Sequence, residues 1–181
     1  NIDPANRNVL VTHQFVTGAE LSESEDIIVG GTDNVSGEVF DGFDYVALGH
    51  IHREQTVGKD NIRYCGTPLK YSFSEAKHIK SVTILDFKDK ENIEYSKIPL
   101  TPLRDMREIR GTYDELTLKS NYENTNVDDY LHITLTDEED IPDAIGKLRS
   151  IYPNIMKLDY DNLRTRGSGI VDAIENIESK S

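Results

Sequence analysis

The sequence predicts a mixed α/β (α+β) protein built from two parts, and three observations support this. Short apolar, β-branched runs separated by glycine-rich and polar turns predict strands over the first hundred residues. Two prolines at residues 99–102 interrupt this pattern, which is typical of a crossing between domains. Beyond them, strand-like and helix-like segments alternate. We therefore expect one domain over residues 1–100 and a second, βαβαβ-like domain over residues 101–181.

In the first part, two strands are each predicted to end close to a histidine. Residues 9–12 and 44–48 are apolar runs typical of strands buried on both faces. His13 follows the first run directly, and His50 follows the second after one glycine. Because loops at the carboxyl ends of strands build the ligand site of open α/β sheets, we expect both histidines at one crevice.

The remaining elements of the first part follow from turn residues. The long polar segment 18–38 is predicted to be mostly loop, with a short extended run at residues 27–29. A strand is predicted at residues 62–65, followed by a turn at residues 66–68. Residues 81–87 and 93–98 predict a hairpin closed by a polar turn.

In the second part, strands are predicted at residues 106–109, 130–135 and 155–160. Helices are predicted at residues 113–119 and 142–152. Pro142 suits the first turn of the second helix, and the acidic run 137–140 suits its positive end. Loose chain at residues 164–169 and a short apolar stretch at 170–177 complete the prediction.

Composition limits the classes of function. The formal net charge of -13 argues against broad binding of a nucleic-acid backbone by this chain alone. Cys65 is the only cysteine, which excludes an internal disulfide and a thiolate metal cage. Since no apolar run approaches the roughly 20 residues of a membrane span and no signal-peptide pattern is visible, we expect a cytoplasmic protein without a membrane partner.

The sequence Gly49-His50-Ile51-His52 carries the sharpest chemical signal. Side chains two residues apart in an extended segment point to the same side, so His50 and His52 can present imidazoles side by side. Gly49 allows close approach, and Ile51 is expected to point into the core. An isolated His-x-His pair is more often one surface ring and one core ring. The buried strand before it and the second strand ending on His13 instead favour metal binding.

Other candidates have weaker support. The turn at residues 66–68 is best explained by turn chemistry, and its functional alternative places Lys70 or Ser72 along a DNA path. Arginines 104, 107 and 110 could line a phosphate groove, although such charges usually lie on a solvated face. The consecutive acids 137–140 cannot converge on one ion without a tight loop. Substrate-binding residues therefore stay unassigned.

Three longer runs carry a family resemblance: residues 8–16, residues 47–53, and residues 64–75 together with 98–100 and 104–107. Together they resemble the carboxyl-terminal portion of the SbcD family, the nuclease subunits of SbcCD DNA repair complexes. The Gly-His-x-His element is shared by calcineurin-like metallophosphoesterases, whereas the third run is more particular to SbcD. The resemblance implies that residues 1–100 form the carboxyl-terminal part of an αββα metallophosphoesterase sandwich and residues 101–181 a capping domain.

The resemblance also implies an activity, cofactors and partners. It implies an ATP-dependent double-stranded DNA exonuclease and single-stranded and hairpin endonuclease, acting in DNA repair, recombination and replication. The cofactor would be two Mn²⁺, with Mg²⁺ as the alternative; His13 and His50 would bind one ion and His52 the other. Implied partners are DNA ends and hairpins, an SbcC-type ATPase subunit, and a second nuclease subunit in a homodimer.

The sequence departs from the family in one respect. The motifs Asp-x-His, Gly-Asp-x-x-Asp and Gly-Asn-His-Asp/Glu, which supply the other metal ligands and the histidine that assists the leaving group, do not occur in it. We therefore expect an incomplete active site with no catalytic residue of its own, and an inactive chain when isolated. Two alternatives stay open: residues 101–181 as a protein-interaction or allosteric module, and a dimetal phosphoesterase with a nucleotide or phosphoprotein substrate.

Overall fold

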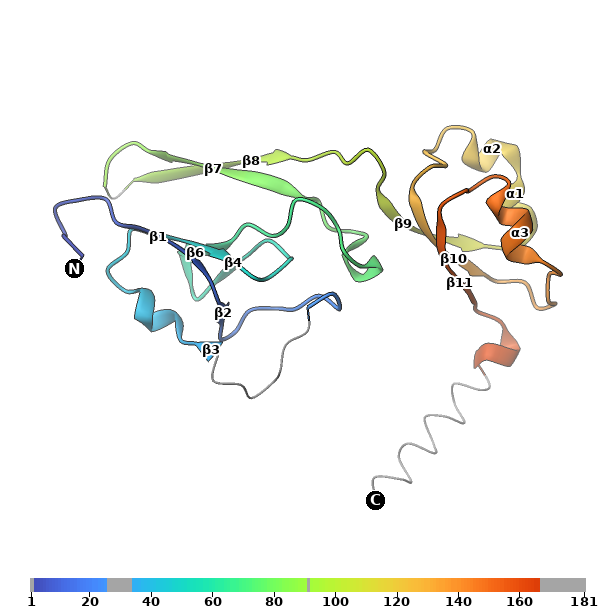
Figure 1. The fold of residues 1–181 in the computed structure, drawn as a ribbon, viewed down its shortest axis with the longest axis horizontal. Coiled ribbons are helices and arrows are strands. Elements are labelled where there is room, and N and C mark those ends of the chain that lie inside the picture. Colours follow the sequence, from blue (N-terminus) through green and yellow to red (C-terminus); the bar gives the residue numbers. More distant parts are fainter. Residues whose placement is uncertain (1, 26–33, 91, 167–181) are drawn as a thin grey trace, which may run out of the picture. The chain divides into compact units, whose positions relative to one another are not determined.

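The computed structural model describes residues 2–25, 34–90 and 92–166 of the chain. Contacts within the chain divide it into two units, Asn1–Leu103 and Arg104–Ser181, which are drawn in Figure 1. The extended segment predicted at residues 27–29 and the apolar stretch at 170–177 lie outside the described residues. Within the described residues, no helix is long and apolar enough to cross a membrane. The elements are strands with a few short helices, which confirms the predicted mixed α/β (α+β) class.

The first unit is organised around a four-stranded sheet in the order β1-β4-β6-β5. Its strands are β1 (Val9–His13), β4 (Tyr45–Gly49), β6 (Lys59–Tyr64) and β5 (Gln55–Val57). The first three run parallel, and β5 is antiparallel to β6. In the register of β1 and β4, His13 lies opposite Gly49. The carboxyl ends of the two strands therefore meet, as the sequence predicted.

Burial differs between these two strands. The core of the unit contains Val46 and Leu48 of β4, as expected for a central strand. The expectation that residues 9–12 are buried on both faces was wrong, because Val11 is 78% exposed and Val9 is 45% exposed. Among the described residues β1 has β4 as its one strand neighbour, so it lies at an edge of this sheet.

The backbone that follows β1 is held in place by one buried tyrosine. Tyr64 is fully buried, and its hydroxyl accepts a hydrogen bond from the Val16 amide (2.8 Å) and donates one to the Gln14 carbonyl (2.7 Å). Such a buried hydroxyl with both roles satisfied adds specificity to the packing. It holds the backbone directly after His13 against the core.

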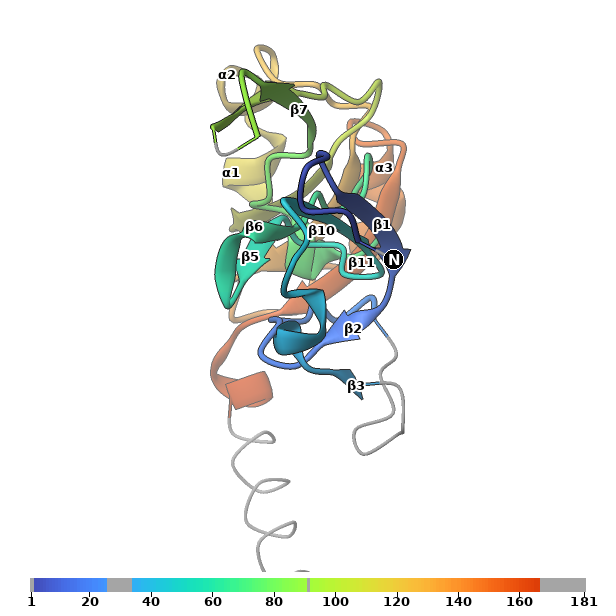
Figure 2. The same cartoon turned by 90° about the vertical axis from the view of Figure 1, so that its left-hand side faces the viewer.

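Smaller elements complete the first unit. The short parallel pair β2 (Phe15–Val16) and β3 (Asn34–Val35) continues past the end of β1, as the turned view shows (Figure 2). The predicted hairpin is confirmed as β7 (Ser81–Phe87) paired antiparallel with β8 (Ile93–Pro99). Two 3₁₀ turns occur at Gly37–Phe40 and Phe73–Glu75.

The second unit is a three-stranded parallel sheet in the order β11-β10-β9. Its strands are β9 (Met106–Gly111), β10 (Tyr130–Leu135) and β11 (Ile155–Tyr160), and its helices are α1 (Tyr113–Thr117), α2 (Lys119–Tyr122) and α3 (Ala144–Arg149). Helices α1, α2 and α3 gather on one side of the sheet (Figure 1). There the buried side chains of β10 pack with Leu148 and Tyr152 in a core separate from that of the first unit.

Two helix predictions need correction. The single helix predicted at residues 113–119 is replaced by α1 and α2, because Leu118 between them is extended, with ψ 120°. The helix predicted at residues 142–152 spans only Ala144–Arg149. The acidic run 137–140 does not supply the negative charge expected in the first turn of α3. The Asp137 carboxylate instead accepts the Tyr113 amide at the start of α1 (2.8 Å), and Asp140 pairs with Arg164.

Candidate metal centre

His13 and His50 lie side by side at the carboxyl ends of β1 and β4. Nε2 of His13 is 3.3 Å from Nδ1 of His50, and the two ring centroids are 5.2 Å apart in an edge-on arrangement. Two nitrogens that bind one ion at about 2.1 Å, at tetrahedral or octahedral angles, lie roughly 3.0–3.4 Å apart. The observed separation therefore fits two ligands of a single metal ion.

Gly49 makes room for this pair. A Cβ atom at this position would lie 2.8 Å from Nδ1 of His13, closer than side-chain contacts allow. The glycine opposite His13 in the register is thus required by the position of the imidazole, and the close approach expected from the sequence is confirmed.

The backbone of His50 is in a conformation that non-glycine residues rarely adopt. Its φ is 100°. Residues held in such regions cost of the order of 1–3 kcal/mol and persist where the surrounding structure imposes them, commonly at functional sites. Here the turn ends β4 at Gly49 and directs the His50 ring toward His13 and Phe15. The strained backbone therefore coincides with the pairing of the two imidazoles.

The structure does not place His50 and His52 side by side in one extended segment. That premise was wrong because the positive φ of His50 breaks the alternation of side chains. Ile51 is buried in the core, as predicted. The His52 ring instead faces Ser24, Glu75 and the ring of Tyr71, whose centroid is 5.2 Å away.

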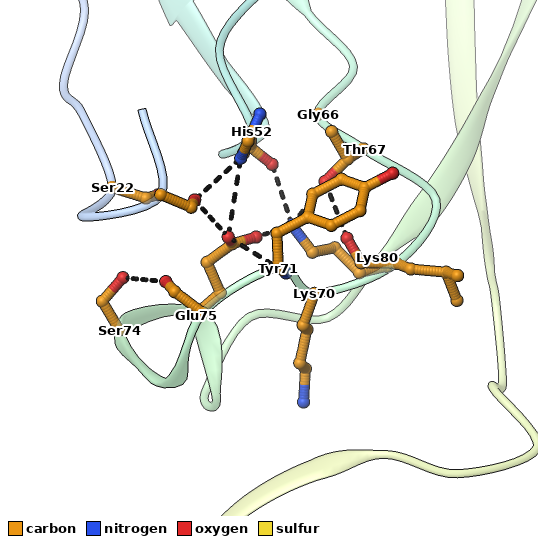
Figure 3. A network of polar contacts seen from close by, with 12 residues as sticks. Ser22, His52, Gly66, Thr67, Lys70, Tyr71, Ser74, Glu75 and Lys80 are labelled. Carbon is orange, nitrogen blue, oxygen red and sulfur yellow. Dashed lines mark hydrogen bonds and ion pairs between the residues drawn. The ribbon is translucent and has the colours of Figure 1, made fainter. Parts of the chain in front are cut away.

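A polar network surrounds His52 on this side (Figure 3). Its Nδ1 is 2.8 Å from Ser24 Oγ and 3.6 Å from a Glu75 carboxylate oxygen. The Ser24 hydroxyl donates to the same carboxylate (2.6 Å). The ammonium of Lys80 reaches both the second Glu75 oxygen (2.5 Å) and the His52 carbonyl (2.9 Å). Both the ring and the main chain of His52 are therefore fixed by neighbouring groups.

Glu75 is the centre of this network. Its side chain is fully buried. Burial by itself raises the pKa of a carboxyl, but the hydrogen bonds from Lys80 and Ser24 outweigh it and hold the Glu75 pKa below its usual value. The carboxylate is consequently an acceptor for all of its neighbours, including the Tyr71 amide (3.3 Å).

The three predicted histidines thus fall into two environments. The rings of His13 and His50 lie beside each other, whereas the His52 ring contacts Ser24 instead. Across the parts of the chain that the structure describes, no three side chains of His, Cys, Asp or Glu gather as a metal-binding cluster. Imidazole nitrogens are common ligands of transition-metal ions, and the spacing of His13 and His50 would allow both to bind one such ion.

Ser24, Glu75 and Lys80 were given no role from the sequence. Ser24 and Glu75 lie 28 and 23 positions from His52, in segments without regular periodicity. A lysine five residues after a glutamate outside a helix gives no local signal of an ion pair. Glu75 and Lys80 are recognised as an ion pair only because the structure shows both charged side chains buried together.

The turn at Gly66 supports the same histidine. Gly66 has φ 76°, and a Cβ there would lie 2.8 Å from the His52 carbonyl oxygen. The amide of the next residue, Thr67, donates to that carbonyl (3.2 Å).

The two residues considered for a DNA path have contacts within the chain. The Lys70 ammonium donates to the Ala76 carbonyl (2.7 Å). Ser72, the other candidate, contacts a neighbouring serine hydroxyl.

Two of the three candidate arginines of the second unit pair with carboxylates. Arg107 pairs with Asp129 (2.6 Å), and Arg110 pairs with Asp161. Both arginines also line a pocket of this unit, together with Glu115 and Tyr152, so a phosphate groove there stays a prediction.

Comparison with known proteins finds a matching family model over the second unit and a similar relative over most of the chain. Residues 102–181 match the family model SbcD_C, described as the type 5 capsule protein repressor C-terminal domain. The chain as a whole is similar to SbcD, a subunit of the nuclease SbcCD, from Staphylococcus epidermidis, with 35% identity over 159 residues, 87% of this chain and 42% of the relative. These matches confirm the resemblance to the carboxyl-terminal portion of SbcD. The chain spans less than half the length of this relative.

Proposed function

We propose that this chain is part of a metal-dependent nuclease subunit of the SbcCD type. The observation that carries the proposal is the pairing of His13 and His50, with 3.3 Å between ring nitrogens, at the carboxyl ends of two parallel strands. The similarity to an SbcCD nuclease subunit supports phosphodiester hydrolysis as the reaction.

In this proposal His13 and His50 hold one Mn²⁺ ion and His52 contributes to a second, with Mg²⁺ as the alternative. Two such ions would activate water and neutralise the charge of the phosphodiester. The chain's own residues orient the ligands: Gly49 leaves space for the His13 ring, and the strained backbone of His50 turns its Nδ1 toward that ring. The remaining ligands and the group that protonates the leaving oxygen would come from other parts of the full-length protein.

The proposed substrate is DNA, cut at double-stranded ends, in single strands and at hairpins in an ATP-dependent reaction during repair, recombination and replication. The proposed partners are an SbcC-type ATPase and a second copy of the nuclease subunit, in the cytoplasm. The net charge of -13 indicates that most of the affinity for the DNA backbone comes from outside this chain. The first unit would be the carboxyl-terminal part of an αββα phosphoesterase domain, and the second unit would be a capping domain.

The test is nuclease activity of the full-length protein with its ATPase partner, Mn²⁺ and a hairpin substrate. The His50→Ala variant is expected to lose activity, whereas the control His132→Gln, in the second unit, is expected to keep it. Unchanged cleavage by His50→Ala would contradict the proposal. Hydrolysis of nucleotides or phosphoproteins with no cleavage of DNA would support the alternative substrate class.

The alternative of an interaction module for residues 101–181 concerns the second unit alone. The carboxylates paired with Arg107 and Arg110 compete with phosphate for these guanidinium groups. DNA affinity of the full-length protein that is unchanged in Arg107→Gln and Arg110→Gln variants would agree with that view.

A further inference from the structure

We infer that Ser24 and Glu75 are positioning residues that select the tautomer of His52 and present its Nε2 atom as the metal-binding nitrogen. This inference rests on the proposed role of His52 as a metal ligand. It goes beyond that role by giving a positioning function to two residues that are not proposed ligands. It follows from the direction of hydrogen bonds in the network around Glu75 (Figure 3).

The Ser24 hydroxyl is the informative group. It has one hydrogen, and it lies 2.6 Å from a Glu75 carboxylate oxygen and 2.8 Å from Nδ1 of His52. A carboxylate can only accept, so the Ser24 hydrogen is committed to Glu75. The Ser24 oxygen must then accept from His52, which requires a hydrogen on Nδ1.

The assignment of Glu75 as an acceptor is secured by its other contacts. The Lys80 ammonium donates to its second oxygen (2.5 Å), and the Tyr71 amide donates to the first (3.3 Å). A lysine ammonium and an amide have no acceptor capacity toward the carboxylate, so the chain of donors runs in one direction, from His52 through Ser24 to Glu75.

The consequence falls on the other ring nitrogen. A neutral imidazole with its hydrogen on Nδ1 carries its lone pair on Nε2, the form that coordinates metal ions. Metal-binding histidines commonly donate their second nitrogen to a carboxylate or hydroxyl, and loss of that partner typically lowers metal affinity by roughly 10–100-fold.

The backbone of His52 is held by the same group. The Lys80 ammonium donates to the His52 carbonyl (2.9 Å) and to the Thr67 hydroxyl (3.0 Å) while it pairs with Glu75. One buried ion pair therefore anchors both the ring, through Ser24, and the main chain. We expect this arrangement to leave the His52 ring little rotational freedom before any ion binds.

The test uses the full-length protein that contains this sequence, with ¹⁵N-labelled histidine and without metal. The NMR spectrum reports the tautomer of each ring, and a His52→Gln variant assigns the His52 signals. The wild type is expected to show hydrogen on Nδ1 of His52. Ser24→Ala removes the bridge and leaves the buried ion pair intact, so it is expected to lose that tautomer preference without unfolding.

The matched control is Ser74→Ala, because Ser74 is an exposed serine whose hydroxyl contacts only Ser72 and the Glu23 amide among the hydrogen bonds of the described residues. It is expected to leave the tautomer unchanged. Mn²⁺ affinity, measured by calorimetry, is expected to fall roughly 10–100-fold in Ser24→Ala and to stay within about twofold in the control.

Each outcome decides the inference. Hydrogen on Nε2 of His52 in the wild type, or an unchanged tautomer in Ser24→Ala, would overturn it, as would unchanged Mn²⁺ affinity in Ser24→Ala despite a changed tautomer. A failure of the proposed function would look different: His52→Gln would then bind Mn²⁺ as well as the wild type does, whatever the tautomer.

Discussion

Replacing Gly49 by alanine is expected to weaken metal binding without unfolding the protein. The new Cβ would lie 2.8 Å from Nδ1 of His13, whereas ordinary contacts begin at 3.4 Å, so the ring must retreat by about 0.6 Å. Metal–ligand distances tolerate deviations of only about 0.2 Å. The His13 nitrogen is thus expected to leave its place beside His50, and Mn²⁺ affinity of the full-length protein should fall by roughly tenfold or more.

A matched control separates crowding at His13 from a general effect of alanine. At Gly37 a Cβ would lie 3.9 Å from the nearest side chain, so Gly37→Ala is expected to keep full affinity. Calorimetric titration with Mn²⁺ and thermal unfolding should be measured on both variants. If Gly49→Ala binds Mn²⁺ within about twofold of the wild type, the reasoning from this close approach is refuted.

Two further predictions concern stability. Lys80→Met leaves the Glu75 carboxylate buried without its partner, so it should lower the free energy of unfolding in urea by about 3–5 kcal/mol. Much of this loss should be recovered in the double variant Lys80→Met/Glu75→Gln. Equal stability of the single and double variants would contradict the prediction. Hydrogen bonds from Arg166 and Arg110 lower the Asp161 pKa to about 2, so these contacts stabilise the fold above the carboxyl's ordinary pKa and are lost as the pH falls toward 2. Asp161→Asn should therefore lower the urea midpoint at pH 7 but hardly at pH 2, and an equal difference at both pH values would count against it.

The strands were the most predictable part of the fold. Apolar runs with β-branched residues located β4, β7 and β10 closely, because their side chains pack in the way their spacing indicates. Strand β5 and the start of β6 were missed, since their polar residues carry no periodicity. The exposure of β1 could not be read from its apolar sequence, because burial depends on which neighbours a strand has in the sheet.

The candidate site was predictable only in part. Two strands that end near histidines were enough to predict that His13 and His50 come together, since parallel strands place their carboxyl ends at one edge. The path after His50 was not predictable, because its positive φ is imposed by tertiary structure and not by local sequence. The partners of His52, Ser24 and Glu75, reach it across long sequence separations and left no pattern.

The most direct test of the central claim is whether His13 and His50 bind one shared ion. Mn²⁺ affinity of the full-length protein should be measured for the wild type, His13→Ala, His50→Ala and the double variant. If both rings bind the same ion, the effects are expected to be strongly non-additive, with the double variant little weaker than either single variant. Losses that add independently, or no loss in either single variant, would contradict a metal site built on this pair.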